Sequence, residues 1–212
     1  MNAEAATADL ILASGSAVRA RLLKSAGLDF TVDVAAVDEE TVKESMLAEL
    51  KPGLSALRDI ADALAELKAL RVSRRHPEAF VIGADQVLGL DLDGSWQMFD
   101  KPVDMAGARD HLTQLRGREH RLITAACIVR GGKPIWRHIR TPRLTMREFS
   151  DKFLDDYLAQ SGEKILSSVG AYLLEDRGAQ LFSQIDGDYF SILGLPLLQL
   201  LDFLRGHGIV KK

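Results

Sequence analysis

Apolar positions along the chain follow two periods that alternate. Continuous or alternating apolar runs predict strands at 9–13, 29–37, 80–90, 120–130 and about 134–147. Apolar residues at three- and four-residue spacing, bounded by capping residues, predict helices at 16–27, 54–75, about 104–116, 150–160 and 196–205. The Asp93-Gly94 pair is typical of a hairpin turn, so hairpins are mixed with the helices. We therefore expect an α/β fold built on a bent, mixed β-sheet.

Length and composition fit a single folded unit. The 212 residues are 47% hydrophobic and 27% charged, and they contain no internal repeat, low-complexity tract or linker. We expect one domain over residues 9–205, with two lobes around a central cleft and short tails at 1–8 and 206–212.

Charge, hydropathy and cysteine usage exclude several classes of protein. The net charge is −3 and no run of lysine or arginine occurs, so no nucleic-acid polymer is expected as a partner. No apolar run approaches ~20 residues, and the first residues lack the basic flank and apolar core of a signal peptide, so we expect a cytoplasmic protein without membrane contact. Cys127 is the only cysteine, and its apolar neighbours predict a buried strand position rather than a nucleophile.

The junction between the first strand and the first helix has the residues of an anion site. Ser14, Gly15 and Ser16 form a turn before the helix, and Arg19 follows in its opening turns. A helix N-terminus presents free N–H groups and the positive end of the dipole, hydroxyls add donors, and arginine adds a charge-assisted bond. The simpler alternative is that Ser16 only caps the helix and the arginine is solvated. No P-loop motif occurs.

Two charged residues interrupt apolar patterns. Asp85 ends the apolar run FVIGA, where a carboxylate must be paired, bind a metal or lie in an exposed loop. Lys68 follows Leu64 by one turn on the apolar side of its helix, so it either points into a cleft or extends its ammonium group back to solvent. Taken alone, Lys101 in a turn and Glu39 in an acidic run are typical of the surface.

The order of these features along the chain resembles the Maf family of nucleotide pyrophosphatases. The resemblance covers residues 10 to about 200 and rests on eight collinear segments: LILASGSxxRxxLL, VDE, LAxxKA, IGADQV, DKP, GxxHxxxT, GAY and IDGDYFSILGLPL. It implies a fold related to that of the inosine triphosphate pyrophosphatases, and a homodimer. It also implies hydrolysis of the α–β phosphoanhydride of a nucleoside triphosphate with a divalent cation, Mg²⁺ or Mn²⁺.

The resemblance also implies roles for the cationic and hydroxyl residues noted above. Ser14, Ser16 and Arg19 match phosphate-binding positions of the family. Lys68 and Lys101 match two cations that neutralise charge developing on the phosphates in the transition state.

Two acidic residues match the metal-binding positions of the family. These are Glu39 and Asp85, whose carboxylate oxygens suit Mg²⁺. Asp85 also matches the general base that deprotonates the attacking water.

Three positions differ from the usual family pattern in a way that concerns the base. Gln86 and Glu175 replace the threonine and glutamine typical of the thymidine- and uridine-selective branch, and both favour the branch that acts on 7-methyl-GTP. A carboxylate only accepts hydrogen bonds, and guanine offers two adjacent donors on its Watson–Crick edge. Val18, in contrast, stands where that branch typically has a tryptophan able to stack on a methylated purine. Glu175 would read no base if it faced solvent or paired with Arg177.

Two other functions are compatible with parts of this pattern. Ser167 and Ser168 replace the acid and lysine of the common DKAGAY segment, which fits a nucleotide-binding regulator of weak activity, and members of the family are linked with septum formation. Glu39 and Asp85 could also form the carboxylate pair of a glycoside hydrolase. The lysines and the arginine of the pattern favour a polyanionic substrate over a neutral sugar.

Overall fold

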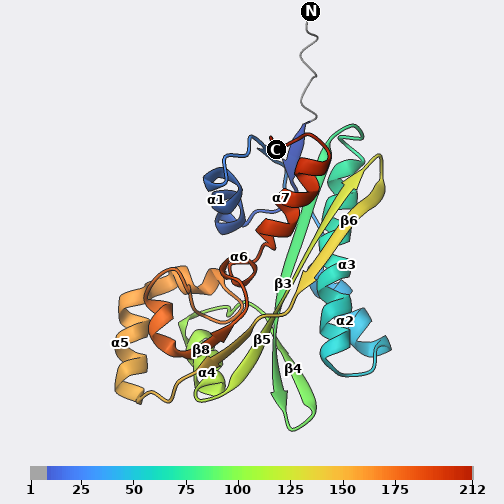
Figure 1. Ribbon diagram of the computed structural model, residues 1–212. Coiled ribbons are helices and arrows are strands. Elements are labelled where there is room, and N and C mark those ends of the chain that lie inside the picture. The colour runs from blue at the N-terminus through green and yellow to red at the C-terminus, as the bar shows by residue number, and fades with distance from the viewer. Residues whose placement is uncertain (1–8, 212) are drawn as a thin grey trace, which may run out of the picture.

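The computed structural model describes residues 9–211, and the expected N-terminal tail at 1–8 lies outside them (Figure 1). The strands are β1 Leu10–Leu12, β2 Thr31–Val32, β3 Phe80–Leu92, β4 Ser95–Phe99, β5 Glu119–Arg130, β6 Lys133–Arg140, β7 Arg143–Met146 and β8 Phe182–Asp186. The α-helices are α1 Ala17–Ser25, α2 Glu39–Glu49, α3 Leu54–Ser73, α4 Met105–Leu115, α5 Asp151–Ser161, α6 Tyr189–Ile192 and α7 Leu197–Gly206. In this part of the chain, none of the helices has the length and hydropathy that a bilayer span requires.

The eight strands of the described residues form one mixed sheet. Its order is β2-β1-β3-β5-β7-β8, with β4 paired to β3 and β6 paired to β5. Strand β1 runs parallel to β2 and β3, and the other pairs are antiparallel. The long strands β3 and β5 have different neighbours at their two ends and so join the two lobes of the molecule. The predicted α/β fold with a mixed sheet is confirmed.

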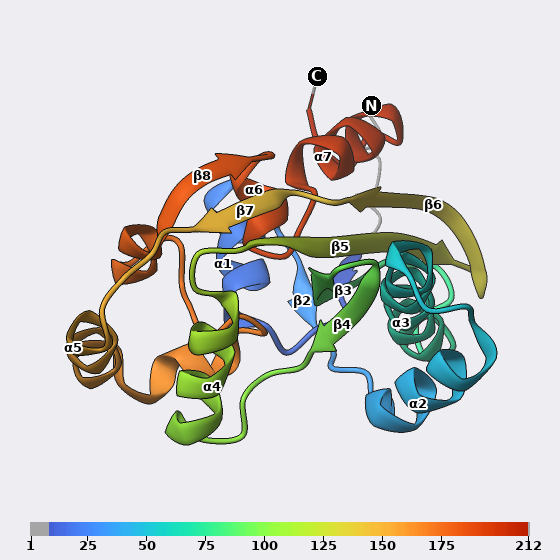
Figure 2. The same cartoon turned by 90° about the horizontal axis from the view of Figure 1, so that it is seen from below.

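Side chains of a strand alternate between its two faces, so the apolar strands β3 and β5 have two apolar faces to cover. Different helices pack on each of these faces. Val81 and Val87 of β3 pack in the cluster under α3, whereas Ile82 and Ala84 pack in the cluster under α1 and α7. A separate cluster joins α4 and α5 to the far end of β3. Figure 2 shows α4 and α5 at the left of the view and α2 and α3 at the right, with β3 and β4 between them. By the same alternation, Asp85 faces α3.

Helix α2 is the main difference from the sequence prediction. The segment 29–37 was predicted as a strand and the acidic run after it as surface, but only Thr31–Val32 pairs with β1. Asp38 then caps α2, and its Oδ1 accepts a hydrogen bond from the Thr41 backbone N–H at 3.2 Å. The acidic run is therefore the first turn of a helix, where negative charge is favoured by the helix dipole.

The strand predicted at 134–147 is also divided in the structure. Strands β6 and β7 both pair with β5, and Pro142 lies between them. Proline has no N–H group for a sheet hydrogen bond, so the ladder is interrupted there. The hairpin predicted at Asp93-Gly94 is confirmed, with both residues at positive φ (53° and 91°) between β3 and β4.

Candidate active site

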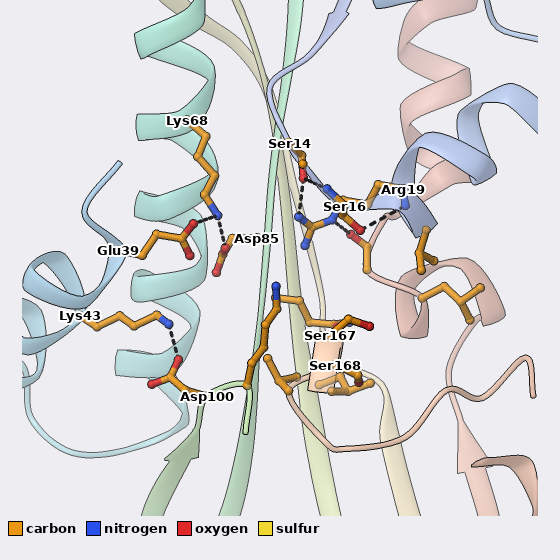
Figure 3. Close-up of a pocket in the computed structure, with 18 of the residues that line it drawn as sticks. Ser14, Ser16, Arg19, Glu39, Lys43, Lys68, Asp85, Asp100, Ser167 and Ser168 are labelled. Atoms are coloured by element: carbon orange, nitrogen blue, oxygen red, sulfur yellow. Dashed lines mark hydrogen bonds and ion pairs between the residues drawn. The ribbon is translucent and has the colours of Figure 1, made fainter. Parts of the chain in front are cut away.

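A cavity of about 820 Å³ opens where segments from both lobes meet (Figure 3). Its walls come from the turn before α1, from α2, α3 and β3, from the loop after β4, and from residues 167–175. Every candidate residue of the sequence analysis lines this cavity: Ser14, Ser16, Val18, Arg19, Glu39, Lys68, Asp85, Gln86, Lys101 and Glu175. The fold therefore brings together side chains from all parts of the chain.

Arg19 is fixed in the cavity wall by neutral groups. Ser16 caps α1, and its Oγ accepts a hydrogen bond from the Arg19 backbone N–H at 3.4 Å. The guanidinium donates from Nε to the Gly194 carbonyl at 2.8 Å, and from Nη1 to Ser14 Oγ at 3.0 Å and to the Ala84 carbonyl at 2.9 Å. Burial lowers the pKa of Arg19 and nearby carboxylates raise it, but arginine stays protonated at neutral pH. Its charge is thus held in position without being consumed by these bonds.

Lys68 connects two carboxylates at the centre of the cavity. Its Nζ donates to Asp85 Oδ1 at 2.6 Å and lies 2.8 Å from Glu39 Oε1. Lys68 is 7% exposed and Asp85 is 5% exposed, whereas the Glu39 side chain is 42% exposed. Lys68 therefore points inward, and Asp85 is not in an exposed loop. Lys68 and Asp85, the two charges that interrupt apolar patterns in the sequence, therefore neutralise each other.

Small residues let α3 approach β3 closely enough for this contact. A Cβ atom added at Gly83 would lie 2.0 Å from the Ala65 carbonyl oxygen and 2.9 Å from Ala69 Cβ. Lys68 follows Ala65 by about one helical turn, and Asp85 lies on the same face of β3 as Gly83. The close packing of the helix on the strand therefore places the ammonium group against the carboxylate.

The environment of Asp85 shifts its proton affinity. Burial raises the pKa of the Asp85 carboxyl, while the charges of Lys68 and Arg19 act to lower it. The net direction is upward, towards the range in which a carboxylate can exchange a proton near neutral pH. This places a general-base candidate between two cations.

The lining carries six acidic side chains and four cationic ones. The acids are Glu39, Glu40, Glu44, Asp85, Asp100 and Glu175, and the cations are Arg19, Lys43, Lys68 and Lys101. Across residues 9–211, no three histidine, cysteine or carboxylate side chains gather as a preformed metal site. Two carboxylates, those of Glu39 and Asp85, meet at Lys68. Mg²⁺ is commonly bound by one or two carboxylates together with substrate phosphates.

The chain also resembles known proteins over most of its length. A family model described as "Maf-like protein" matches residues 9–207. The chain belongs to the Maf family. A relative from Paramagnetospirillum magneticum is 57% identical over 198 residues, which cover 93% of this chain and 98% of that protein. A second from Granulibacter bethesdensis is 54% identical over 198 residues, covering 93% and 96% of the two chains. Both carry the name "Nucleoside triphosphate pyrophosphatase".

Among solved structures, this Maf chain has a more distant similarity. A nucleoside-triphosphatase/dITP/XTP pyrophosphatase from Mycobacterium abscessus covers 93% of this chain and 100% of its own, with 17% identity and a TM-score of 0.42. A similarity at this level does not transfer residue roles.

Glu175, the candidate reader of the base in this Maf protein, is already paired. Its Oε1 accepts a hydrogen bond from Arg21 Nη2 at 2.7 Å, and its side chain is 19% exposed. The partner is Arg21 of α1, not Arg177. The Arg21 side chain is 57% exposed, so the pair lies at the rim of the cavity.

Gln86 is held on the opposite face of β3 from Asp85. Its Nε2 donates to Thr124 Oγ1 at 2.7 Å and to the carbonyls of Ser191 and Ile192, both at 3.1 Å. These contacts commit the amide NH₂ group to β5 and α6.

Sequence reasoning missed Lys43 and Asp100, which line the same cavity. Lys43 Nζ forms an ion pair with Asp100 Oδ1 and joins α2 to the loop after β4 (Figure 3). The missed signal was Asp38, whose capping of α2 makes Glu39 and Lys43 one turn apart on the same helix. Ser167 and Ser168 also line the cavity, and Ser167 Oγ donates a hydrogen bond to the Lys164 carbonyl at 2.7 Å.

Proposed function

We propose that this chain hydrolyses the α–β phosphoanhydride of a nucleoside triphosphate and releases a nucleoside monophosphate and pyrophosphate. The observation that carries the proposal is the buried Lys68–Asp85 pair beside Arg19 on the wall of an open cavity. It combines a carboxylate of raised pKa with two fixed cations, which is what phosphoryl transfer requires. The name of the relative that is 57% identical over 93% of this chain supports the same activity.

In this reaction Asp85 accepts a proton from the attacking water. The water oxygen bonds to the α-phosphorus, and the bond from that phosphorus to the bridging oxygen breaks, so pyrophosphate leaves. Arg19, Lys68 and Lys101 stabilise the negative charge on the phosphate oxygens. The Lys101 residue is exposed and flanks the cavity, so its ammonium group reaches a bound polyphosphate without a burial cost.

The donor set fits a divalent cation, and we assign Glu39 and Asp85 as its protein ligands. The excess of carboxylates over cations in the lining disfavours a bare triphosphate, because negative charge would meet negative charge. When bound, Mg²⁺ or Mn²⁺ would offset the charge of the phosphate oxygens. Lys68 holds the two carboxylates together before any ion enters.

For the base, we propose a guanine-type nucleotide such as 7-methyl-GTP. The Glu175 carboxylate accepts but does not donate hydrogen bonds, which matches the two adjacent donors of guanine. Arg21 donates its hydrogen bond to Oε1, which leaves the lone pairs of Oε2 available to a base. A base without matching donors would form no hydrogen bond with this carboxylate and would be bound less tightly.

The test is pyrophosphate release from a nucleotide panel with Mg²⁺. The panel holds dTTP, UTP, CTP, GTP, ATP, ITP and 7-methyl-GTP, with Asp85→Asn as the inactive variant and Asp110→Asn, an exposed residue of α4, as its matched control. Glu175→Gln should shift preference away from guanine-type bases, whereas Glu163→Gln, exposed and outside the cavity, should not. Full turnover by Asp85→Asn would refute the catalytic assignment. A pyrimidine preference in the wild type would refute the role of Glu175 only.

A further inference from the structure

Helix α2 is attached to the molecule mainly through one apolar stripe and two ion pairs. None of its residues is buried. Val42, Met46 and Leu50 pack against the cluster under α3. The adjacent face carries Glu39 and Lys43, one turn apart, and both line the cavity. The ion pairs Glu39–Lys68 and Lys43–Asp100 therefore help to hold this face of α2 at the cavity.

The Lys43–Asp100 pair is unequal in its exposure. The Lys43 side chain is 16% exposed, whereas the Asp100 side chain is 58% exposed. An ion pair with one largely solvated partner contributes little to stability, because water competes for the carboxylate. Lys43 is the more enclosed of the two side chains and lines the cavity, so its ammonium group is accessible to a ligand bound there.

The position of Lys43 suits one end of a polyphosphate. Figure 3 shows the Lys43–Asp100 pair on the α2 side, with Glu39, Lys68 and Asp85 between it and the Ser14–Arg19 wall. The cavity therefore has a cation at each side of its reactive centre. A terminal phosphate group carries up to about two negative charges, against one on a carboxylate, so it can compete with Asp100 for Lys43 through charge-assisted hydrogen bonds.

We propose that Lys43 is a phosphate-binding residue that exchanges Asp100 for the pyrophosphate portion of the substrate and of the released product. This inference rests on the proposed pyrophosphatase function, because it names the substrate group that α2 would hold. Lys43 acts here as a binding residue, and Asp100 competes with the phosphates for it. The two halves of one ion pair are then expected to have opposite effects on ligand affinity.

The experiment is calorimetric titration of inorganic pyrophosphate into the full chain in Mg²⁺ buffer, together with KM and kcat for the preferred nucleotide. The variants are Lys43→Met, Lys43→Arg and Asp100→Asn, each checked by thermal melting. Lys51→Met is the matched control, since Lys51 follows α2, is exposed and lies outside the cavity. Lys43→Met should weaken pyrophosphate binding about tenfold and raise KM by a similar factor. Lys43→Arg should restore most of the affinity.

Asp100→Asn decides between binding and a purely structural pair. It frees Lys43 and should leave pyrophosphate affinity unchanged or up to about fivefold higher. If Lys43→Met and Asp100→Asn weaken binding equally, or if Lys43→Met behaves as Lys51→Met, the proposal is overturned while wild-type turnover still supports the pyrophosphatase. Absence of both turnover and pyrophosphate binding in the wild type would overturn the two proposals together.

Discussion

Replacing Lys68 with methionine should destabilise the fold, because it leaves a buried carboxylate without its ion-pair partner. Asp85 is 5% exposed and loses a contact of 2.6 Å. Removing one member of a buried pair costs about 3–5 kcal/mol. The charge of Arg19 remains nearby and offsets part of this cost, although its hydrogen bonds go to other groups. We therefore expect a loss of about 3 kcal/mol in the free energy of unfolding, at the lower end of that range. At about 2–4 °C per kcal/mol, Tm falls by roughly 10 °C.

The destabilisation should increase with pH. Without Lys68 the pKa of the folded Asp85 carboxyl rises further above its unfolded value, because burial is then less opposed. A carboxyl whose folded pKa is raised favours the folded state while it is protonated, and this benefit is lost as pH rises through the folded pKa. Lys68→Met should therefore be closer to wild-type stability at about pH 5 than at about pH 8.

The assay is urea unfolding followed by circular dichroism at both pH values, for Lys68→Met, Asp85→Asn and the double variant. The double variant should recover part of the loss, because no unpaired charge stays buried. Glu39→Gln serves as a comparison, because the Glu39 side chain also pairs with Lys68 but is 42% exposed. It should lower the free energy of unfolding by less than about 1 kcal/mol. The reasoning fails if Lys68→Met loses the same stability at both pH values and Asp85→Asn does not relieve it.

Three further predictions concern other residues of the site and core. Asp85→Asn should lower kcat about 10²–10⁴-fold. Wild-type kcat should fall as pH drops through the raised pKa of Asp85, because the base must be ionised, and a pH–rate profile of both proteins measures the two effects. Gly83→Ala should cost at least about 3 kcal/mol in urea unfolding, because the new Cβ would lie 2.0 Å from the rigid Ala65 carbonyl. Burial lowers the pKa of His120 to about 3, so the protein should lose about 2 kcal/mol of stability at about pH 5 relative to neutral pH, as the unfolded histidine gains a proton below ~6.5. His120→Gln should remove that slope in the same unfolding assay, and an unchanged slope would contradict the assignment.

The elements that the sequence predicted well are those with a strong apolar period. Helix α3 and strands β3 and β5 agree with their predicted ranges to about two residues, because each buries a continuous stripe or run. Helix α2 has no buried residue, so its sequence carried little periodic signal. Its start is fixed by a local cap at Asp38 and its position by packing on α3, and the second of these is a tertiary property.

The same reasoning explains which site residues could be predicted. Lys68 and Asp85 stand out because each interrupts an apolar pattern, and burying an unpaired charge is so unfavourable that a partner must exist. The sequence does not say that they are partners of each other. That contact depends on the close packing of Gly83 against α3, which two separate patterns cannot reveal.

Two other ion pairs at the cavity are weak enough to be opened at little cost. Lys43–Asp100 and Arg21–Glu175 join residues 57 and 154 positions apart, and each has one member more than half exposed. Such pairs contribute less than about 1 kcal/mol, so they impose no pattern on the sequence around them. For the same reason a charged ligand can open them at little cost, whereas opening Lys68–Asp85 would leave a buried charge unpaired. Under the proposed function, substrate recognition falls to these two weak pairs, and the buried Lys68–Asp85 pair keeps the reacting groups in place.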